Sequence, residues 1–369
     1  MALDFSLSDS QVILRSLARA FCTRELTPSF LKELDESGRA PGELLPKLAA
    51  EGFTGLPIPK EYGGQGGSAT DVVVLLEEFG RASLGIASFL NRAFGWGAET
   101  LQKFGTEEQK RRYLPRVPAG EMIFAFSHTE PGAGSDAAAI RTRATADGDH
   151  FIINGAKIFT TGAAECPLLT VSARTDPATS PDHAKHKGLT MFLVEGSTPG
   201  VTYRKIEKLG MRGAGGLYEV EYHDVRVPRS AVLGAVNGGW QVITSTLERA
   251  RIAQAAYCVG AAQRALDDLG SENSLLKLLA RTATARLLLY RAAFLVDEGT
   301  PCACEASIAN LHSTENLVAV TEVALRLWGK RAYTGETDID IQLRDARLFV
   351  IGDGSSQIQR NLIARQMGL

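Results

Sequence analysis

The sequence predicts a mainly α-helical protein with a central β domain, and the spacing of its apolar residues supports this prediction. Apolar residues recur at helical intervals in the first third of the 369 residues and again in the last third. Between these blocks the period changes to two, which is typical of β-strands. We therefore expect three domains: a helical domain over residues 1–120, a β domain over 121–233, and a helical domain over 234–369.

The first block begins with a helix-start signal. Ser8 followed by Gln11 makes a capping box, in which each side chain bonds the other residue's backbone N–H. Leu14, Leu17 and Phe21 then share one face of the expected helix. A glycine-rich stretch, PIPKEYGGQGGS, later interrupts the helical pattern, as glycine and proline do.

The middle block reads as a β-meander. Two turn dipeptides, Asp147-Gly148 and Asn154-Gly155, are expected to separate three short strands. Four more alternating runs follow, up to about residue 228, so the block has enough strands for a small sandwich or barrel. Long helices rich in Ala and Leu are expected after residue 238.

Charge and composition exclude several classes of protein. The net charge is −2, so nothing suggests an electrostatic grip on nucleic acid or anionic lipid. No apolar run approaches the roughly 20 residues that span a bilayer, and we expect a cytoplasmic protein. Five cysteines suit reduced thiols, and the Cys302-x-Cys304 pair near His312 lacks a second ligand pair, so no metal site is expected.

The loop FSHTEPGAGSDAAAIRT, residues 126–142, is the sharpest motif. Three small residues flanked by Thr129 and Ser135 leave backbone N–H groups and two hydroxyls open, which suits a polar ligand lying against the main chain. A plain surface turn explains the glycines equally well when the loop is taken alone.

A second motif, IGDGSSQIQRNLIAR, places Asp353 between two glycines after an apolar helix. Asp tolerates turn conformations and caps helices, so a structural role is the simplest interpretation of the local sequence. A carboxylate in a dry pocket can instead act as a general base, because its pKa is then raised toward neutrality.

Five segments in this order and spacing resemble the acyl-CoA dehydrogenase family over nearly the whole chain: TEPGAGSD, INGAKIFTTG, KLGMRG, HDVRVP and SSQIQRNLIAR. The resemblance implies an N-terminal helical domain, a β-barrel or sandwich middle domain and a C-terminal four-helix bundle. It also implies FAD bound between domains and across the subunit interface of a homodimer or homotetramer. The implied reaction removes the α-proton of an acyl thioester to a carboxylate while the β-hydrogen leaves as hydride to flavin N5.

The resemblance also assigns site residues. The expected cofactor contacts are Phe126, His128, Thr129, Ser135, Phe159, Thr160, Thr161, Ser355 and Gln357. The expected substrate contacts are Ser135, Arg92, Trp96, Arg251 and Gly354. Asp353 occupies the position of the family's catalytic glutamate, one methylene shorter, and Gly352 would leave room for that difference. Ala250, at the alternative base position before Arg251, offers no rival carboxylate.

Three departures from the family pattern carry further expectations. The segment DLGSENSLLKLLART stands where the family has a longer basic segment that reaches the FAD of a partner subunit. Lys330 and Arg331 are expected to restore positive charge near the FAD pyrophosphate. The alternative is that both are ordinary solvated charges. Trp96 is expected to shorten the tunnel that holds the acyl group of the substrate in the family. A buried Arg92 needs a partner, which a polar or acidic acyl terminus would supply, unless Arg92 snorkels to solvent.

Three functions remain in competition. The first is an FAD-dependent dehydrogenase of an acyl thioester, carried on CoA or on an acyl carrier protein, with a flavoprotein or oxygen as electron acceptor. The second is a related flavin oxidase or monooxygenase of natural-product biosynthesis. The third is a non-catalytic structural subunit of a mixed oligomer, against which the retained TEPGAGSD, the Phe159-Thr160-Thr161 triplet and the carboxylate at position 353 argue.

Overall fold

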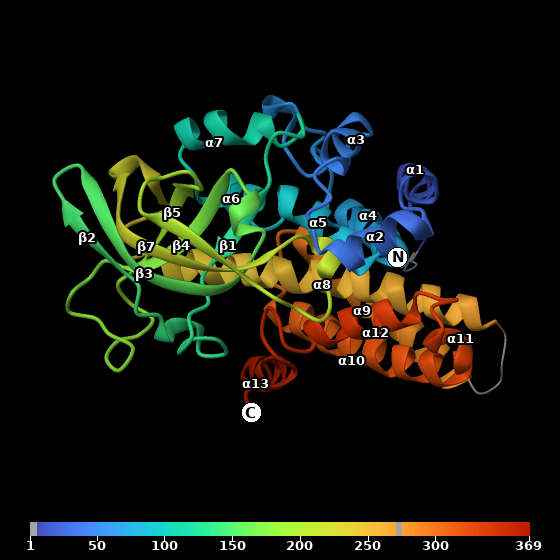
Figure 1. Ribbon diagram of the computed structural model, residues 1–369. Coiled ribbons are helices and arrows are strands. Elements are labelled where there is room, and N and C mark those ends of the chain that lie inside the picture. The colour runs from blue at the N-terminus through green and yellow to red at the C-terminus, as the bar shows by residue number, and fades with distance from the viewer. Residues whose placement is uncertain (1–5, 271–274) are drawn as a thin grey trace. The chain divides into compact units, whose positions relative to one another are not determined.

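The computed structural model describes residues 6–270 and 275–369, which form two compact units (Figure 1). Unit 1 contains the described residues up to Ser37 together with Gly67–Ser88 and Arg251–Leu369. Unit 2 contains Gly38–Gly66 and Phe89–Ala250.

Unit 1 is helical. Its helices are α1 (Asp9–Glu25), α2 (Pro28–Ser37), α4 (Ala69–Ala82), α9 (Leu276–Asp297), α10 (Ala303–Trp328), α11 (Lys330–Tyr333), α12 (Ile339–Phe349) and α13 (Ser356–Gln366). Two more helices, α5 (Leu84–Phe94) and α8 (Gly239–Leu269), run from one unit into the other. At the start of α1 the expected capping box is confirmed, because Ser8 and Gln11 bond each other's backbone N–H.

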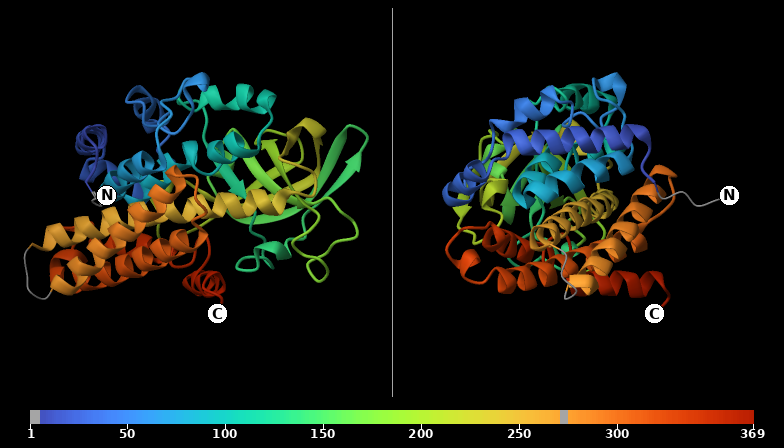
Figure 2. Two further views of the ribbon diagram at one scale, coloured as in Figure 1. Left: turned by 180° about the vertical axis from the view of Figure 1, so that it is seen from behind. Right: turned by 90° about the vertical axis from the view of Figure 1, so that its right-hand side faces the viewer.

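Helix α10 is central in unit 1, since it packs against α9, α12 and α13, and α9 and α10 lie side by side in Figure 2. Helix α4 packs against α1 and α9. It also crosses α8 closely: a Cβ at Gly260 would collide with the carbonyl of Glu77, and one at Gly80 would collide with Tyr257. Glycine is therefore required at both positions by the approach of the two backbones.

Unit 2 holds the strands and a few short helices. The strands are β1 (Phe124–Ser127), β2 (Arg143–Asp147), β3 (His150–Thr161), β4 (Leu168–Arg174), β5 (Leu189–Glu195), β6 (Val201–Ile206), β7 (Leu217–Pro228) and β8 (Val232–Leu233). They form one sheet in the order β6-β7-β3-β2-β4-β5-β8, with β1 parallel to β4 (Figure 1). The α-helices are α3 (Leu44–Ala50), α6 (Ala98–Phe104) and α7 (Glu107–Tyr113). The helical, sheet and helical order of the elements confirms the expected fold class.

One of the two expected turns is correct and the other is wrong. Asp147-Gly148 turns the chain between β2 and β3, which then pair antiparallel. Asn154-Gly155 makes no turn, because β3 continues through it with a shift of register against β7. Asn154 bonds Asp224 across the strands, and a Cβ on Gly155 would lie 2.5 Å from Thr142 Oγ1. The glycine thus marks a β-bulge at a close approach.

Within residues 6–270 and 275–369, no helix is long and apolar enough to cross a bilayer, and no group of His, Cys, Asp or Glu is arranged to hold a metal ion. All five cysteines are free thiols, and four of them are buried.

Candidate active site

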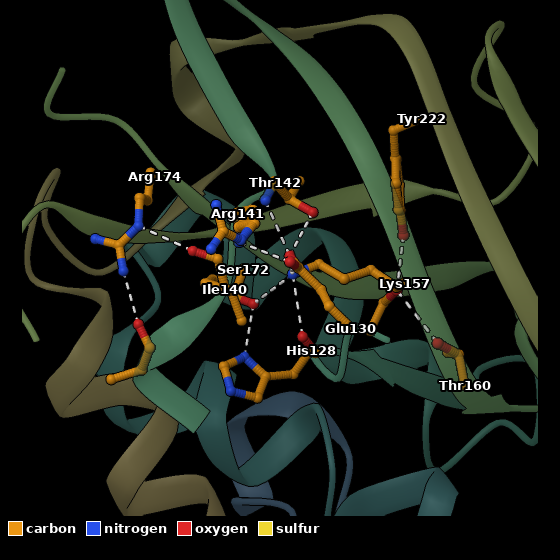
Figure 3. Close-up of polar contacts among 12 residues, drawn as sticks. His128, Glu130, Ile140, Arg141, Thr142, Lys157, Thr160, Ser172, Arg174 and Tyr222 are labelled. Carbon is orange, nitrogen blue, oxygen red and sulfur yellow. Dashed lines mark hydrogen bonds and ion pairs between the residues drawn. The ribbon is translucent and has the colours of Figure 1, made fainter. Parts of the chain in front are cut away.

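The glycine loop of residues 130–142 is closed by one buried carboxylate in unit 2 (Figure 3). Glu130 accepts hydrogen bonds from the backbone N–H groups of Arg141 and Thr142, at 2.6 and 3.0 Å, and from Thr142 Oγ1 at 2.6 Å. Because Glu130 precedes the glycines and Thr142 follows them, this carboxylate pins both ends of the loop. Ser135 lies exposed on it.

Lys157 on β3 supplies the positive charge that neutralises the Glu130 carboxylate. Its Nζ donates to Glu130 Oε1 at 2.8 Å, to the carbonyl of His128 at 3.1 Å and to Ser172 Oγ at 3.2 Å (Figure 3). Burial lowers the pKa of Lys157 to about 8, although Glu130 opposes that change. Burial alone would raise the pKa of Glu130, but the charge of Lys157 and the hydrogen bonds from Lys157, Thr142 and the Arg141 N–H outweigh it and hold that pKa below its usual value. The pair is therefore ionised and hydrogen-bonded, which suits a structural anchor.

His128 and Thr129 connect this anchor to the neighbouring strand. His128 is buried with Nδ1 2.6 Å from Ser172 Oγ, and burial together with the charge of Lys157 lowers its pKa to about 3, so the ring is neutral. The carbonyl of Thr129 accepts from the N–H of Ile158 at 2.8 Å. The start of the loop, just after β1, is thus hydrogen-bonded to the C-terminal part of β3.

Phe159 has an unusual backbone and an unusual exposure. Its φ of 59° lies in the left-handed region, at an irregularity in β3 between Lys157 and Thr160, and its side chain is 58% exposed. Bulky residues rarely adopt this conformation, which costs about 1–3 kcal/mol and clusters at functional sites. A strained aromatic that faces out of a rigid strand offers a stacking surface for a planar ring, so this part of the chain fits the isoalloxazine of a flavin.

Arg92 and Trp96 lie on or just after α5, and the structure corrects the reasoning about Arg92. The Arg92 side chain is buried and donates to the carbonyls of Phe124, Gly162 and Ala214 at 3.1–3.4 Å and to Cys166 Sγ at 2.8 Å. Arg92 neither snorkels to solvent nor needs a substrate partner, because the protein satisfies it. Trp96 stacks on Phe126, with ring centroids 5.4 Å apart.

Asp353 lies in unit 1, in the loop between α12 and α13. Its φ is +55° and that of Gly354 is +103°, so the loop depends on left-handed residues. Gln359 Nε2 donates to the carbonyls of Asp353 and Gly354, at 3.3 and 2.9 Å. Ser355 caps α13 by accepting from the N–H of Ile358 at 3.5 Å. The backbone that presents Asp353 is thus held on both sides.

The carboxyl of Asp353 is bonded by an amide. Gln254 Nε2, on α8, donates to Asp353 Oδ2. Burial raises the pKa of Asp353 to about 7, against the opposing effect of the Arg251 guanidinium. A carboxylate with a pKa near neutrality is what general-base catalysis at physiological pH requires.

The remaining sequence-predicted residues are placed as follows. In unit 1, Lys330 and Arg331 are exposed on α11, and Arg331 lies over the Trp328 ring at 4.6 Å and 3.5 Å from Glu336. Gln357 is exposed on α13, and Arg251 is buried on α8. In unit 2, Thr160 is buried beside Ser127. The segment that replaces the family's basic stretch lies partly at 271–274, outside the described residues.

The sequence analysis did not predict several residues of these two clusters, among them Lys157, Gln359, Gln254 and Asn310, which donates to Gln254 Oε1. Each of these four is buried. The available signal was a long polar side chain within an apolar pattern, such as Gln254 in RIAQAAYCVGAA. That signal predicts a polar partner without naming one, because the partner of Gln254 is 99 residues away.

Comparison with known proteins identifies the family to which the chain belongs. The family models described as acyl-CoA dehydrogenase N-terminal, middle and C-terminal domains match residues 8–121, 125–225 and 270–368. The chain therefore belongs to the acyl-CoA dehydrogenase family. It is 35% identical to the caffeyl-CoA reductase-Etf complex subunit CarC of Acetobacterium woodii, over 97% of this chain and 98% of that one.

Similarity to solved structures supports the same family assignment. Butyryl-CoA dehydrogenase from Megasphaera elsdenii superposes with a TM-score of 0.93 at 31% identity, over 100% of both chains. The prolyl acyl carrier protein oxidase AnaB superposes with a TM-score of 0.92 at 29% identity, over 99% of this chain and 100% of that one.

Proposed function

We propose that this chain is an FAD-dependent oxidoreductase that dehydrogenates an acyl thioester between its α and β carbons, with Asp353 as the base. The observation that supports this most is the carboxyl of Asp353. It is held by a neutral amide on a fixed loop, and its pKa is raised to about 7.

The chain's own residues divide the work. Bound FAD supplies the hydride acceptor for the β-hydrogen. The residues proposed to contact it are Phe126, His128, Thr129, Ser135, Phe159, Thr160, Thr161, Lys330, Arg331, Ser355 and Gln357. Asp353, which is half-buried, takes the α-proton, and the partial loss of water around its carboxyl raises its pKa toward neutrality. Ser135, Arg251 and Gly354 are proposed to contact the thioester.

The acyl group is proposed to be short. This proposal is supported by Trp96, which stacks on Phe126 and is proposed to limit the length of the acyl chain. The guanidinium of Arg92 is bonded by backbone carbonyls and Cys166, so it does not require an acidic acyl terminus as a partner.

The carrier is CoA or an acyl carrier protein, since relatives named for each superpose on this chain. The electron acceptor is an electron-transferring flavoprotein, as in the complex that names the Acetobacterium relative, or oxygen, as for an oxidase. We further propose a cytoplasmic homodimer or homotetramer.

Anaerobic mixing tests this function. FAD-loaded protein is combined with propionyl-, butyryl-, isobutyryl- and octanoyl-CoA, and with the first three acyl groups on a carrier protein. Bleaching of the flavin by a short thioester, faster than by octanoyl-CoA, is the expected result. The Asp353→Asn protein should retain FAD and bleach about 10²–10⁴-fold more slowly. Wild-type bleaching by Asp353→Asn would remove Asp353 from the mechanism. If no thioester bleaches the flavin, NADH-dependent oxygen consumption in a separate aerobic assay would favour a monooxygenase.

A further inference from the structure

Two buried amides on apolar helices of unit 1 form a chain that ends at Asp353. Asn310 on α10 is 1% exposed and Gln254 on α8 is 4% exposed. Asn310 Nδ2 donates to Gln254 Oε1 at 3.1 Å and to the carbonyl of Arg251 at 3.3 Å. Gln254 Nε2 in turn donates to Asp353 Oδ2.

A backbone carbonyl determines which atoms donate and which accept in this series of hydrogen bonds. An amide side chain has a donor end and an acceptor end, and its orientation follows from its partners. The carbonyl of Arg251 can only accept, so Asn310 must turn its Nδ2 toward it and toward Gln254. Gln254 must then turn Oε1 toward Asn310 and Nε2 toward Asp353. A backbone carbonyl that cannot reverse thus makes Gln254 a donor to the carboxylate.

Gly352 adjoins this amide. A Cβ built at Gly352 would make ordinary contacts, 3.7 Å from Gln254 Nε2 and 3.5 Å from the carbonyl of Leu348. The glycine before Asp353 thus packs next to the glutamine on α8.

We propose that Gln254 is a positioning residue for Asp353 and that Asn310 fixes its hydrogen-bonding direction; this proposal rests on the proposed function. Gln254 occupies Oδ2 and leaves Oδ1, which has no hydrogen-bond partner among the described residues, to take the α-proton. A neutral amide holds the carboxylate without the strong loss of basicity that a bonded cation causes. It thus compensates for a base one methylene shorter than glutamate, whose reach must be fixed closely.

The proposal predicts both a rate and a titration. Gln254→Met keeps the length of the side chain but removes the donor, so flavin reduction by butyryl-CoA, or by whichever thioester of the panel bleaches the flavin fastest, should slow about 10–100-fold with little change in KM. Because a hydrogen bond to the ionised form favours that form, its loss should move the rising limb of the pH–rate profile to higher pH. Asn310→Leu frees the Gln254 amide to reverse and should give a smaller effect in the same direction.

A second readout needs no substrate. Infrared spectra of the FAD-loaded protein with ¹³C-labelled aspartate give the titration of the carboxyl, with Asp353→Asn identifying its band. The band of Asp353 should titrate at higher pH in Gln254→Met than in the wild type. Asn316→Leu is the matched control, since Asn316 is an equally buried amide on α10 that bonds Thr282 instead. It should lower stability without moving either titration.

The outcomes separate the two hypotheses. If Asp353→Asn is slow while Gln254→Met and Asn310→Leu keep the wild-type rate and pH profile, the positioning role is wrong and the proposed function stands. If Asp353→Asn reduces its flavin at the wild-type rate, the proposed function fails and this inference fails with it. If Gln254→Met does not fold, Asn310→Leu carries the test, and an unmoved titration in that variant would overturn the proposal.

Discussion

Glu130 and Asp353 are both desolvated carboxyls beside glycine-rich loops, but their surroundings push their pKa values in opposite directions. Glu130, in unit 2, is bonded by a buried lysine, two backbone N–H groups and a hydroxyl, and its pKa lies below the usual value. Asp353, in unit 1, receives one amide hydrogen bond at its carboxyl, and burial raises its pKa to about 7.

The comparison shows that burial alone does not decide what a carboxyl does. Both groups lose water, and the charge and number of their partners decide the result. Four donors including a cation keep Glu130 ionised and fix a loop. One neutral donor leaves Asp353 able to take up and release a proton near neutral pH. The first arrangement suits structure, and the second suits proton transfer.

The largest expected effect concerns the structural carboxyl. Lys157→Met leaves Glu130 buried without its cation and should lower the free energy of unfolding by about 3–5 kcal/mol, measured by denaturant titration. Adding Glu130→Gln removes the unpaired charge and should recover part of the loss. A single variant as stable as the wild type, or a double variant less stable than the single one, would show that the pair is not the anchor described.

Lengthening the proposed catalytic carboxyl, that of Asp353, is expected to have the next largest effect. Asp353→Glu restores the residue that is usual in the family, but the amide of Gln254 and the loop are arranged for the shorter side chain. Flavin reduction should therefore fall about 10–100-fold, since a misplacement of about 1 Å has this effect. The measurement is anaerobic stopped-flow with the most active thioester. A rate at or above that of the wild type would mean that the site accepts either reach.

The pH dependence of stability gives a third test of the comparison. The folded-state pKa of Asp353 is raised above its unfolded value of about 3.9, so its contribution to stability is fully present below that value and is lost as pH rises through about 7. Asp353→Asn should raise Tm by a few degrees at pH 8 and by less at pH 5. The rate of wild-type flavin reduction should rise over the same pH range, because the base must be ionised.

Glu130 should show the opposite linkage. Its pKa is depressed in the folded state, so its contribution is present above the unfolded value of about 4.3 and is lost as pH falls through the folded value. Glu130→Gln should therefore be less stable than the wild type at pH 7, with the difference shrinking in acid. A Tm difference that grew as the pH fell would contradict the electrostatic account of this residue.

Much of the fold could be predicted from the sequence, because helical and strand periodicities differ and the Asp147-Gly148 turn lies between two alternating runs. The Asn154-Gly155 bulge has the same dipeptide signature as a turn. What separates them is the close packing of Gly155 on Thr142, which the local sequence does not contain.

Residues of the candidate site could be predicted only where they lie in a sequence motif of the family. Asp353 and Phe159 are proposed site residues because of the family resemblance, but the left-handed backbone of both residues was not visible in the sequence. Gln254 and Asn310 were not found, because their meaning depends on contacts between residues 56 and 99 positions apart. Long-range polar pairing is set by the packing of helices, and no local pattern encodes it.

The smallest expected effect concerns two charges outside both carboxyl clusters. Lys330 and Arg331 are proposed to lie near the FAD pyrophosphate, yet both are exposed, and exposed charges contribute about 1 kcal/mol or less. Lys330→Ala/Arg331→Ala should therefore weaken FAD retention measurably, but by no more than about fivefold, determined as flavin released on dilution, and the difference should shrink at high salt. The matched control, Arg326→Ala/Arg347→Ala, removes two other exposed charges from the same unit and should release no additional FAD. Equal retention in wild type and both double variants would show that Lys330 and Arg331 are ordinary solvated charges.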